Sequence, residues 1–194
     1  MTGLVAAACA GVLLASVPAG AAPAPAPETS RATSGPHCAT HVETRKTTCY
    51  DTFREAVSAT TGGRVTNATQ AKAAKDSAFV DKVNETVGAT AGTAATSRAA
   101  SDFFLGVIYE HTRFRGASHQ FWGDGPCNDF SDQEYWMVDL LNWNNRISSL
   151  KTGSNCDIEL FSERDFNGAH QLYFTNTPNV GSAMNDQAES MVWK

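Results

Sequence analysis

Two short segments of the chain concentrate oxygen-bearing side chains within six residues each. They are Asn144-Asn145-Arg146-Ile147-Ser148-Ser149 and Asn185-Asp186-Gln187-Ala188-Glu189-Ser190. Amide, carboxylate and hydroxyl oxygens packed this closely can join nearby carbonyls to hold a hard cation at about 2.3–2.6 Å. Asn and Ser are also enriched in turns that bind nothing, and a lone segment of this type is more simply such a turn. The surrounding elements must therefore decide between a turn and a cation site.

Each oxygen-rich segment is preceded in the chain by a second repeated pattern, aromatic-x4-Phe-x-Gly, in which x is any residue. The first copy runs from Tyr109 to Gly116 and the second from Phe161 to Gly168, at a constant offset of 52 residues. Gly supplies a backbone shape that is forbidden to residues with a Cβ, and the Phe can pack back over the bend. The repeat predicts a strand that runs into a folded hairpin in each copy.

The rest of the C-terminal half consists of short aromatic and β-branched runs with frequent turn residues, and all four Trp residues lie after position 100. This texture predicts an all-β sandwich. Before it, residues 88–101 are almost entirely Ala, Gly, Thr and Ser, which is typical of a flexible linker. A helix is expected after Asp51 or Thr52, ending at Gly62-Gly63, and a weaker helical pattern covers Gln70 to Val87.

The hairpin pattern and the oxygen-rich segments together resemble the two Greek-key motifs of a microbial βγ-crystallin domain, over roughly residues 103–194. The resemblance implies a double Greek-key βγ-crystallin sandwich at 102–194, with motifs at about 103–152 and 155–194. It also implies calcium as the bound ion and no enzymatic activity. The sequence contains none of the H-E-x-x-H, G-x-S-x-G or G-x-x-x-x-G-K-[S/T] motifs.

The resemblance further implies which residues hold calcium. The first site would use Asn144, the carbonyl of Arg146, the carbonyl of Glu110 or of its counterpart Ser162, and the group at position 189. The second would use Asn185, the carbonyl of Gln187 and the Ser148 hydroxyl. Glu189 departs from the family pattern, which has Ser or Thr there. Its carboxylate adds negative charge, but its greater length can also distort the loop.

The N-terminal part predicts an exported protein. Residues 1–22 carry no charge, contain an apolar run from Leu4 to Val17 and end in small residues, as a secretory signal peptide does. A Pro/Ala-rich linker at 23–36 precedes a small helical, disulfide-bearing segment at 37–87. The expected location is secreted and extracellular, with no membrane span after cleavage of the signal.

The cysteines agree with export, because four remain after Cys9 leaves with the signal. An even number in an oxidising compartment favours disulfides, and four cysteines allow three pairings. Proximity favours Cys38–Cys49, expected to staple a small hairpin, and Cys127–Cys156. A zinc site formed by these cysteines is the weaker alternative, because no C-x-x-C spacing is present.

The charge distribution opposes nucleic-acid binding, since residues 101–194 carry 6 basic and 13 acidic residues. Our first hypothesis is a secreted, non-enzymatic calcium-binding protein in which calcium stabilises the fold. The alternative is a secreted metalloproteinase inhibitor or toxin-like protein on the same fold, with a metalloproteinase as partner. An insertion around Gly123 to Trp136 in the first repeat would then be the binding loop. His119 and His170 occupy similar places in the repeats and are expected to face solvent.

Overall fold

The computed structural model describes residues 36–91, 102–127 and 135–194. The predicted signal peptide and all but the last residue of the Pro/Ala-rich linker lie outside the described residues, as does the middle of the predicted insertion. The described residues all belong to one compact unit. Among the described residues, no helix combines the length and the apolar character needed to cross a membrane.

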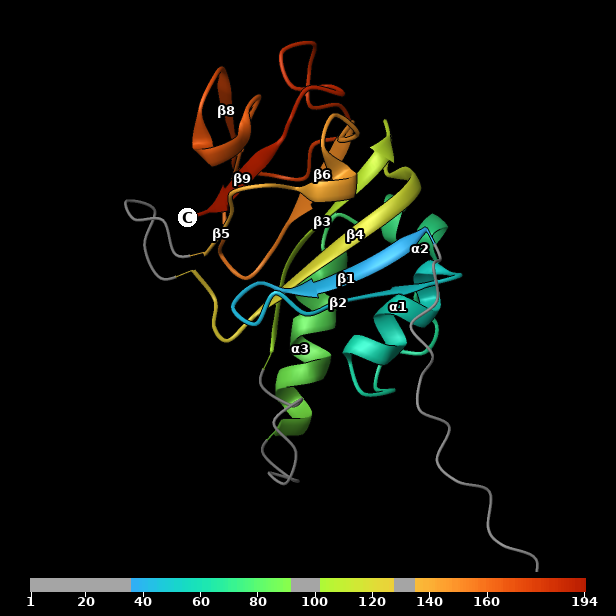
Figure 1. Cartoon of the computed structure of the whole chain (residues 1–194). Helices are drawn as coiled ribbons and strands as arrows, with labels where there is room; N and C mark the ends of the chain where they lie inside the picture. The colour runs from blue at the N-terminus through green and yellow to red at the C-terminus, as the bar shows by residue number, and fades with distance from the viewer. Residues whose placement is uncertain (1–35, 92–101, 128–134) are drawn as a thin grey trace, which may run out of the picture. The chain divides into compact units, whose positions relative to one another are not determined.

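The first sheet joins strands from both halves of the chain. Its members are β1 (His37–His41), β2 (Thr47–Tyr50), β3 (Phe103–His111), β4 (Arg115–Gly123) and β6 (Ser149–Thr152). The order across the sheet is β2-β1-β4-β3-β6, as Figure 1 shows. β1 runs parallel to β4, whereas the other neighbours are antiparallel. The N-terminal hairpin therefore extends the edge of the sheet that the first repeat builds.

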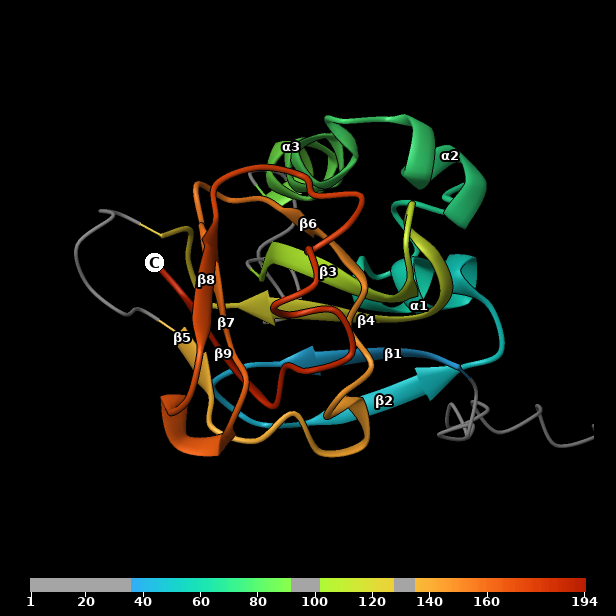
Figure 2. The same cartoon turned by 90° about the horizontal axis from the view of Figure 1, so that it is seen from above.

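The second sheet belongs mainly to the second repeat. It contains β5 (Tyr135–Met137), β7 (Ile158–Phe161), β8 (His170–Tyr173) and β9 (Ser190–Trp193) in the order β5-β9-β7-β8. β7 and β8 cross the direction of β3 and β4 (Figure 2). β5 comes from the first repeat but pairs with β9, and Thr177 of the second repeat forms a bridge to Leu150 in the first sheet. Each repeat thus contributes one segment to the sheet that the other repeat mainly forms.

In the described part of the chain before the repeats there are three α-helices: α1 (Phe53–Thr60), α2 (Gln70–Lys75) and α3 (Phe79–Ala91). α1 begins with the expected capping box, in which the Thr52 side chain accepts from the Glu55 backbone and the Glu55 carboxylate accepts from the Thr52 backbone. The predicted helix over Gln70 to Val87 is interrupted at Asp76. The Asp76 side chain accepts from the Ala78 N–H, a local bond that competes with a continuous helix.

The first sheet has an apolar core on each face. One core lies between the two sheets and includes Leu105, Ile108, Phe121 and Trp193. The other packs the helices against the first sheet, where Phe79 of α3 meets the ring of Phe104 edge to face at 6.2 Å between centroids. Because both faces are covered, β3 is buried continuously from its second to its seventh residue.

The N-terminal segment at 37–87 packs on the first sheet of the repeats. Residues 37–87 do not form a core of their own, because their two strands complete the first sheet and their helices bury its outer face. α3 also continues to Ala91, so that the first four residues of the predicted linker at 88–101 are helical. Residues 92–101 lie outside the described residues. Apart from two 3-10 turns, all regular structure described after residue 101 is strand, which confirms the β-rich C-terminal half.

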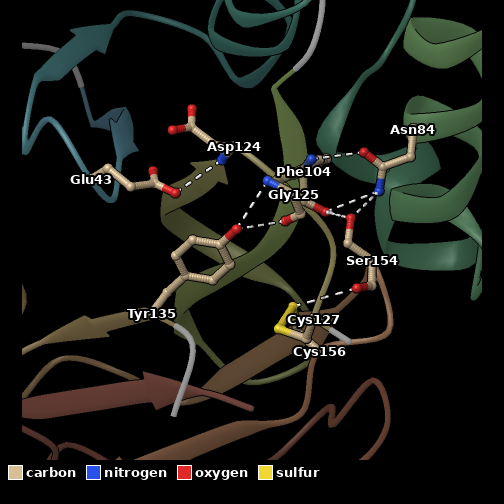
Figure 3. The surroundings of a disulfide bond; sticks show 9 residues. All are labelled: Glu43, Asn84, Phe104, Asp124, Gly125, Cys127, Tyr135, Ser154 and Cys156. Carbon is tan, nitrogen blue, oxygen red and sulfur yellow. Dashed lines mark hydrogen bonds between the residues drawn. A yellow bond between two sulfur atoms is a disulfide. The ribbon is translucent and has the colours of Figure 1, made fainter. Parts of the chain in front are cut away.

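Both predicted disulfides are confirmed. Cys38 and Cys49 are opposite each other in the β1–β2 hairpin, as expected for a stapled hairpin. Cys127 and Cys156 join the segment after β4 to the turn before β7 (Figure 3). The second disulfide therefore fixes the first described part of the predicted insertion to the second repeat.

Candidate cation site at the paired bends

The last Ser of each oxygen-rich segment holds the hairpin of its own repeat. The Ser149 hydroxyl donates to the His111 carbonyl at 2.7 Å and accepts from the Phe114 N–H at 3.0 Å. In the second repeat, the Ser190 hydroxyl donates to the Glu163 carbonyl at 2.6 Å and accepts from the Phe166 N–H at 3.1 Å. The equivalence of these four bonds shows that the sequence repeat is a structural repeat.

The hairpins also share the backbone shape that the repeat predicts. Gly116 and Gly168 both have φ +78°, and a Cβ on either would overlap the side chain of an earlier hairpin residue. The aromatic residue packs edge to face against the Phe in each copy, with centroid distances of 5.7 Å for Tyr109–Phe114 and 5.6 Å for Phe161–Phe166. The glycine and the aromatic pair therefore set the hairpin that leads to each bend.

The two oxygen-rich segments, here called the first bend (residues 144–149) and the second bend (residues 185–190), are paired by reciprocal backbone bonds. The Asn145 N–H donates to the Ala188 carbonyl at 2.8 Å, and the Asp186 N–H donates to the Ile147 carbonyl at 3.0 Å. The second residue of each bend thus bonds to the fourth residue of the other. This pairing places the oxygen-bearing side chains of both repeats in one region.

Side chains cross between the bends with the same symmetry. The Asn145 amide donates to Glu189 Oε1 at 2.9 Å, and the Ser148 hydroxyl faces Asp186 Oδ1 at 3.4 Å. Asn145 and Asp186 adopt left-handed backbone with φ 58° and 55°, a conformation that Asn and Asp tolerate. The second residue of each bend is thereby directed at the fifth residue of the other.

Backbone bonds to the strands decide between the two carbonyls proposed for the first site. The Ser148 N–H donates to the Tyr109 carbonyl at 3.0 Å, and the Glu189 N–H donates to the Phe161 carbonyl at 2.9 Å. Glu110 follows Tyr109 and therefore lies beside Ser148, whereas Ser162 follows Phe161 and lies beside Glu189. Ser162 thus lies beside position 189, which is predicted for the first site, and Glu110 lies beside Ser148, which is predicted for the second site.

The predicted side-chain ligands Asn144 and Asn185 lie one position away from the residues that cross between the bends. The Asn144 amide donates to Asp139 Oδ1 at 2.8 Å, and its own buried Oδ1 has no hydrogen-bond partner among the described residues. The Asn185 amide donates to Asp186 Oδ2 at 2.8 Å. The sequence prediction did not single out Asn145 and Asp186, the two residues whose side chains cross between the bends. The acidic residue at position 186 was the available signal, because carboxylates are the preferred ligands of hard cations.

Several oxygens at the bends are available to a cation. The carbonyls of Arg146 and Gln187, both predicted ligands, accept no hydrogen bond from a described residue. The orphaned Oδ1 of Asn144 adds a second free oxygen at the first bend. An unpaired buried acceptor is costly unless a ligand or water satisfies it. The donor set of the paired bends, all oxygen, therefore fits a hard cation such as calcium.

Two arginines oppose the negative charge near the bends. Arg146 Nη2 lies 2.8 Å from Glu110 Oε1, and hydrogen bonding by Arg146 lowers the pKa of the Glu110 carboxyl. Arg164 Nε lies 3.4 Å from Asp139 Oδ2 and 3.7 Å from Glu189 Oε2. The Glu189 carboxylate is therefore shared between Arg164 and the Asn145 amide. The Asp186 carboxylate has no such cation among the described residues.

The structure corrects the expectation that His119 faces solvent. His119 is 8% exposed, contacts the Thr40 hydroxyl at 2.6 Å and stacks on Phe121 with 4.7 Å between centroids. β1 covers this edge of β4, which the sequence repeat could not indicate. His170 is exposed as predicted.

The chain resembles bacterial βγ-crystallin domains of known structure. One is a domain from Clostridium beijerinckii, at 24% identity over 46% of this chain and 95% of that chain, with a TM-score of 0.36. Another is a domain from Flavobacterium johnsoniae, at 18% identity over 46% and 93%, with a TM-score of 0.34. The N-terminal domain of Protein S matches at 19% identity over 46% and 94%, with a TM-score of 0.37. No protein-family model and no curated protein sequence matches the chain.

Proposed function

We propose that the protein is a secreted, non-enzymatic calcium-binding protein in which calcium bound at the paired bends stabilises the fold. The observation that carries this proposal is the reciprocal pairing of the two bends. The second residue of one bend meets the fifth residue of the other, and free carbonyls lie beside each pair.

The fold that supports these sites is a pair of interlocked Greek keys. In the first repeat, β4, β3 and β6 are neighbours and β5 leaves for the other sheet; in the second, β8, β7 and β9 are neighbours and Thr177 bridges to β6. This exchange supports the double Greek-key interpretation of residues 102–194. The helical segment at 37–91 supports the same sandwich from outside by burying one face of its first sheet.

Each bend would hold one calcium ion. The residues for the first site are Asn144, Asn145, the carbonyls of Arg146 and Ser162, and Glu189. Those for the second are Asn185, Asp186, the carbonyls of Gln187 and Glu110, and Ser148. Bound calcium supplies positive charge between oxygens that otherwise repel one another or lack partners. The residues of this chain position those oxygens through the backbone pairing of the bends.

Calcium at these sites favours the native state because the ligands come together only when both repeats are folded. Extracellular modules bind calcium at roughly 10⁻⁴–10⁻³ M. With about 10 mM calcium, the gain is RT ln(1 + [L]/Kd), roughly 1.4–2.7 kcal/mol for each site. In a protein of this size, that stabilisation raises Tm by roughly 3–11 °C for each occupied site.

Glycine substitutions at the left-handed positions test the proposal without adding backbone strain. Asn145→Gly and Asp186→Gly remove a side-chain ligand but keep the positive φ that Asn145 and Asp186 adopt. Thermal unfolding of the full chain, with and without calcium, is expected to show a rise in Tm for the wild type. Each variant is expected to lose part of that rise, and the double variant most of it.

Asp81→Asn serves as a matched control, because Asp81 is an exposed acid of α3 in the N-terminal segment. The control is expected to keep the full calcium-dependent rise. A wild-type Tm that does not change with calcium contradicts the proposal. The same conclusion follows if Asp186→Gly and Asp81→Asn respond to calcium equally.

Secretion is supported by the two disulfides, which persist in oxidising compartments. The inhibitor alternative stays a prediction, and it has its own assay. A metalloproteinase inhibitor on this fold would reduce the activity of a thermolysin-like enzyme when purified protein is added. Unchanged enzyme activity at a large excess of the protein contradicts that alternative and leaves the calcium proposal intact.

A further inference from the structure

A histidine and two aspartates meet at one end of the first sheet, remote in sequence from the paired bends. His41 ends β1, Asp124 follows β4, and Asp102 precedes β3. Strand register brings them together, because His41 is opposite Trp122, and Phe103 is opposite Gly123. One ligand atom from each of the three residues lies within 4.8 Å of the others.

The distances within this cluster suit a shared metal ion better than direct hydrogen bonds. His41 Nε2 lies 3.3 Å from Asp124 Oδ1 and 3.6 Å from Asp102 Oδ1. Hydrogen bonds from N–H to oxygen are usually 2.7–3.2 Å. Two ligands of a tetrahedral zinc ion, each about 2.0–2.2 Å from the metal, are separated by about 3.3–3.6 Å. His41 Nε2 therefore already has the spacing of a zinc coordination shell from each of the two carboxylates.

The other ring nitrogen of His41, which makes no hydrogen bond to a described residue, lies beside a third carboxylate. Glu43 Oε2 lies 3.1 Å from His41 Nδ1. Glu43 is itself fixed, because its Oε1 accepts from the Asp124 backbone N–H at 3.0 Å (Figure 3). A carboxylate that accepts from Nδ1 holds the proton there and leaves Nε2 free to bind a metal. Glu43 is close enough to take this role once the imidazole turns to bring Nδ1–H into line with its carboxylate.

The excess negative charge of the cluster also favours binding of a cation. Three carboxylates surround one imidazole, which contributes at most a single positive charge. Within the described ranges, no Lys or Arg lies within ion-pair distance of Glu43, Asp102 or Asp124. Imidazole nitrogen favours zinc and similar transition metals, whereas calcium takes oxygen ligands.

We propose that His41, Asp102 and Asp124 bind a zinc-type divalent transition metal ion, with Glu43 orienting His41. The site leaves a coordination position toward solvent, because the Asp124 side chain is 74% exposed. The metal joins the N-terminal hairpin to two strands of the first repeat. It is independent of calcium, because none of its residues belongs to the paired bends.

Calorimetric titration of the full chain with zinc, in excess calcium to saturate the bends, tests this site. The wild type is expected to bind one zinc ion, and His41→Ala to weaken binding at least tenfold. Glu43→Gln is expected to weaken it by about tenfold or more, as loss of an orienting partner does. His111→Ala is the matched control and should bind as the wild type does, because His111 is an exposed histidine at the opposite end of β3.

A second readout covers the case in which His41→Ala does not fold. Asp124→Asn changes an exposed side chain and should also reduce zinc affinity at least tenfold. Cobalt should produce the strong visible absorption of a tetrahedral site in the wild type and not in Asp124→Asn. The site is excluded if the wild type binds neither zinc nor cobalt, or if Asp124→Asn matches His111→Ala in both measurements.

Discussion

Acid should destabilise the folded protein through His119, the buried histidine of β4. The contacts of its ring are the Thr40 hydroxyl, the stacked ring of Phe121 and the edge-to-face ring of Trp143. None of these groups stabilises an imidazolium by charge. We therefore expect the folded state to keep this ring neutral at pH values at which an exposed histidine takes up a proton.

The size of the effect follows from the two pKa values of His119. Burial lowers its pKa in the folded state to about 3, whereas an exposed histidine has a pKa of about 6.5. As the pH falls below about 6.5, His119 binds a proton in the unfolded chain but stays neutral in the folded chain. The free energy of unfolding therefore decreases until about pH 3. The slope is at most about 1.4 kcal/mol per pH unit, or about 2 kcal/mol between pH 7 and pH 5. The corresponding fall in Tm is roughly 4–8 °C.

Thermal or urea unfolding at pH 7, 6 and 5 measures this contribution when His119→Gln is compared with the wild type. Glutamine does not titrate, so the stability of His119→Gln should depend less on pH, whatever its absolute stability. His111→Gln replaces an exposed histidine and should keep the wild-type pH dependence. If wild type and His119→Gln lose stability in parallel between pH 7 and pH 5, the burial argument is wrong.

Three further changes test other contacts. Arg164→Ala should strengthen calcium binding at the first site, which includes Glu189, a few-fold at low salt, by removing a competing cation. A calorimetric titration that shows weaker binding would refute this. Glu159→Gln should lower stability by about 1–3 kcal/mol in urea unfolding, because Glu159 is a buried carboxylate that pairs with Lys194 and contacts the His170 ring, whereas Glu163→Gln at an exposed site should have little effect. Replacing Cys127 and Cys156 by Ser opens a loop of 29 residues and should cost about 3–4 kcal/mol in the same assay; an unchanged midpoint would argue against this cost.

The hairpins and the location of the bends were predictable because their determinants are local. Gly116 and Gly168 mark positions where only glycine fits. Each hydrogen-bond partner of Ser149 in the first hairpin lies 52 residues before the corresponding partner of Ser190 in the second hairpin. The residue types alone did not show which side chains reach from one bend to the other. Asn144 and Asn145 are the same residue type, and only the backbone pairing shows which of them crosses to the other bend.

The N-terminal part extends the first sheet through pairing between segments that are distant in the sequence. No local sequence pattern indicates such pairing. β1 joins β4 in parallel across about 80 residues of sequence, at the register His37 with Ser118. That pairing buries His119 and brings His41 beside Asp124. A periodic pattern reports which residues are buried within one element, but not which other element covers it.

A crystal structure of the full chain grown with calcium tests the central claim most directly. The account predicts an ion at each bend, with Asp186 and Ser148 among the ligands of one ion and Asn145 and Glu189 among the residues at the other. Calcium bound only elsewhere, or bends that stay free of calcium at millimolar concentration while the pairing of residues 145 and 188 is intact, would contradict it.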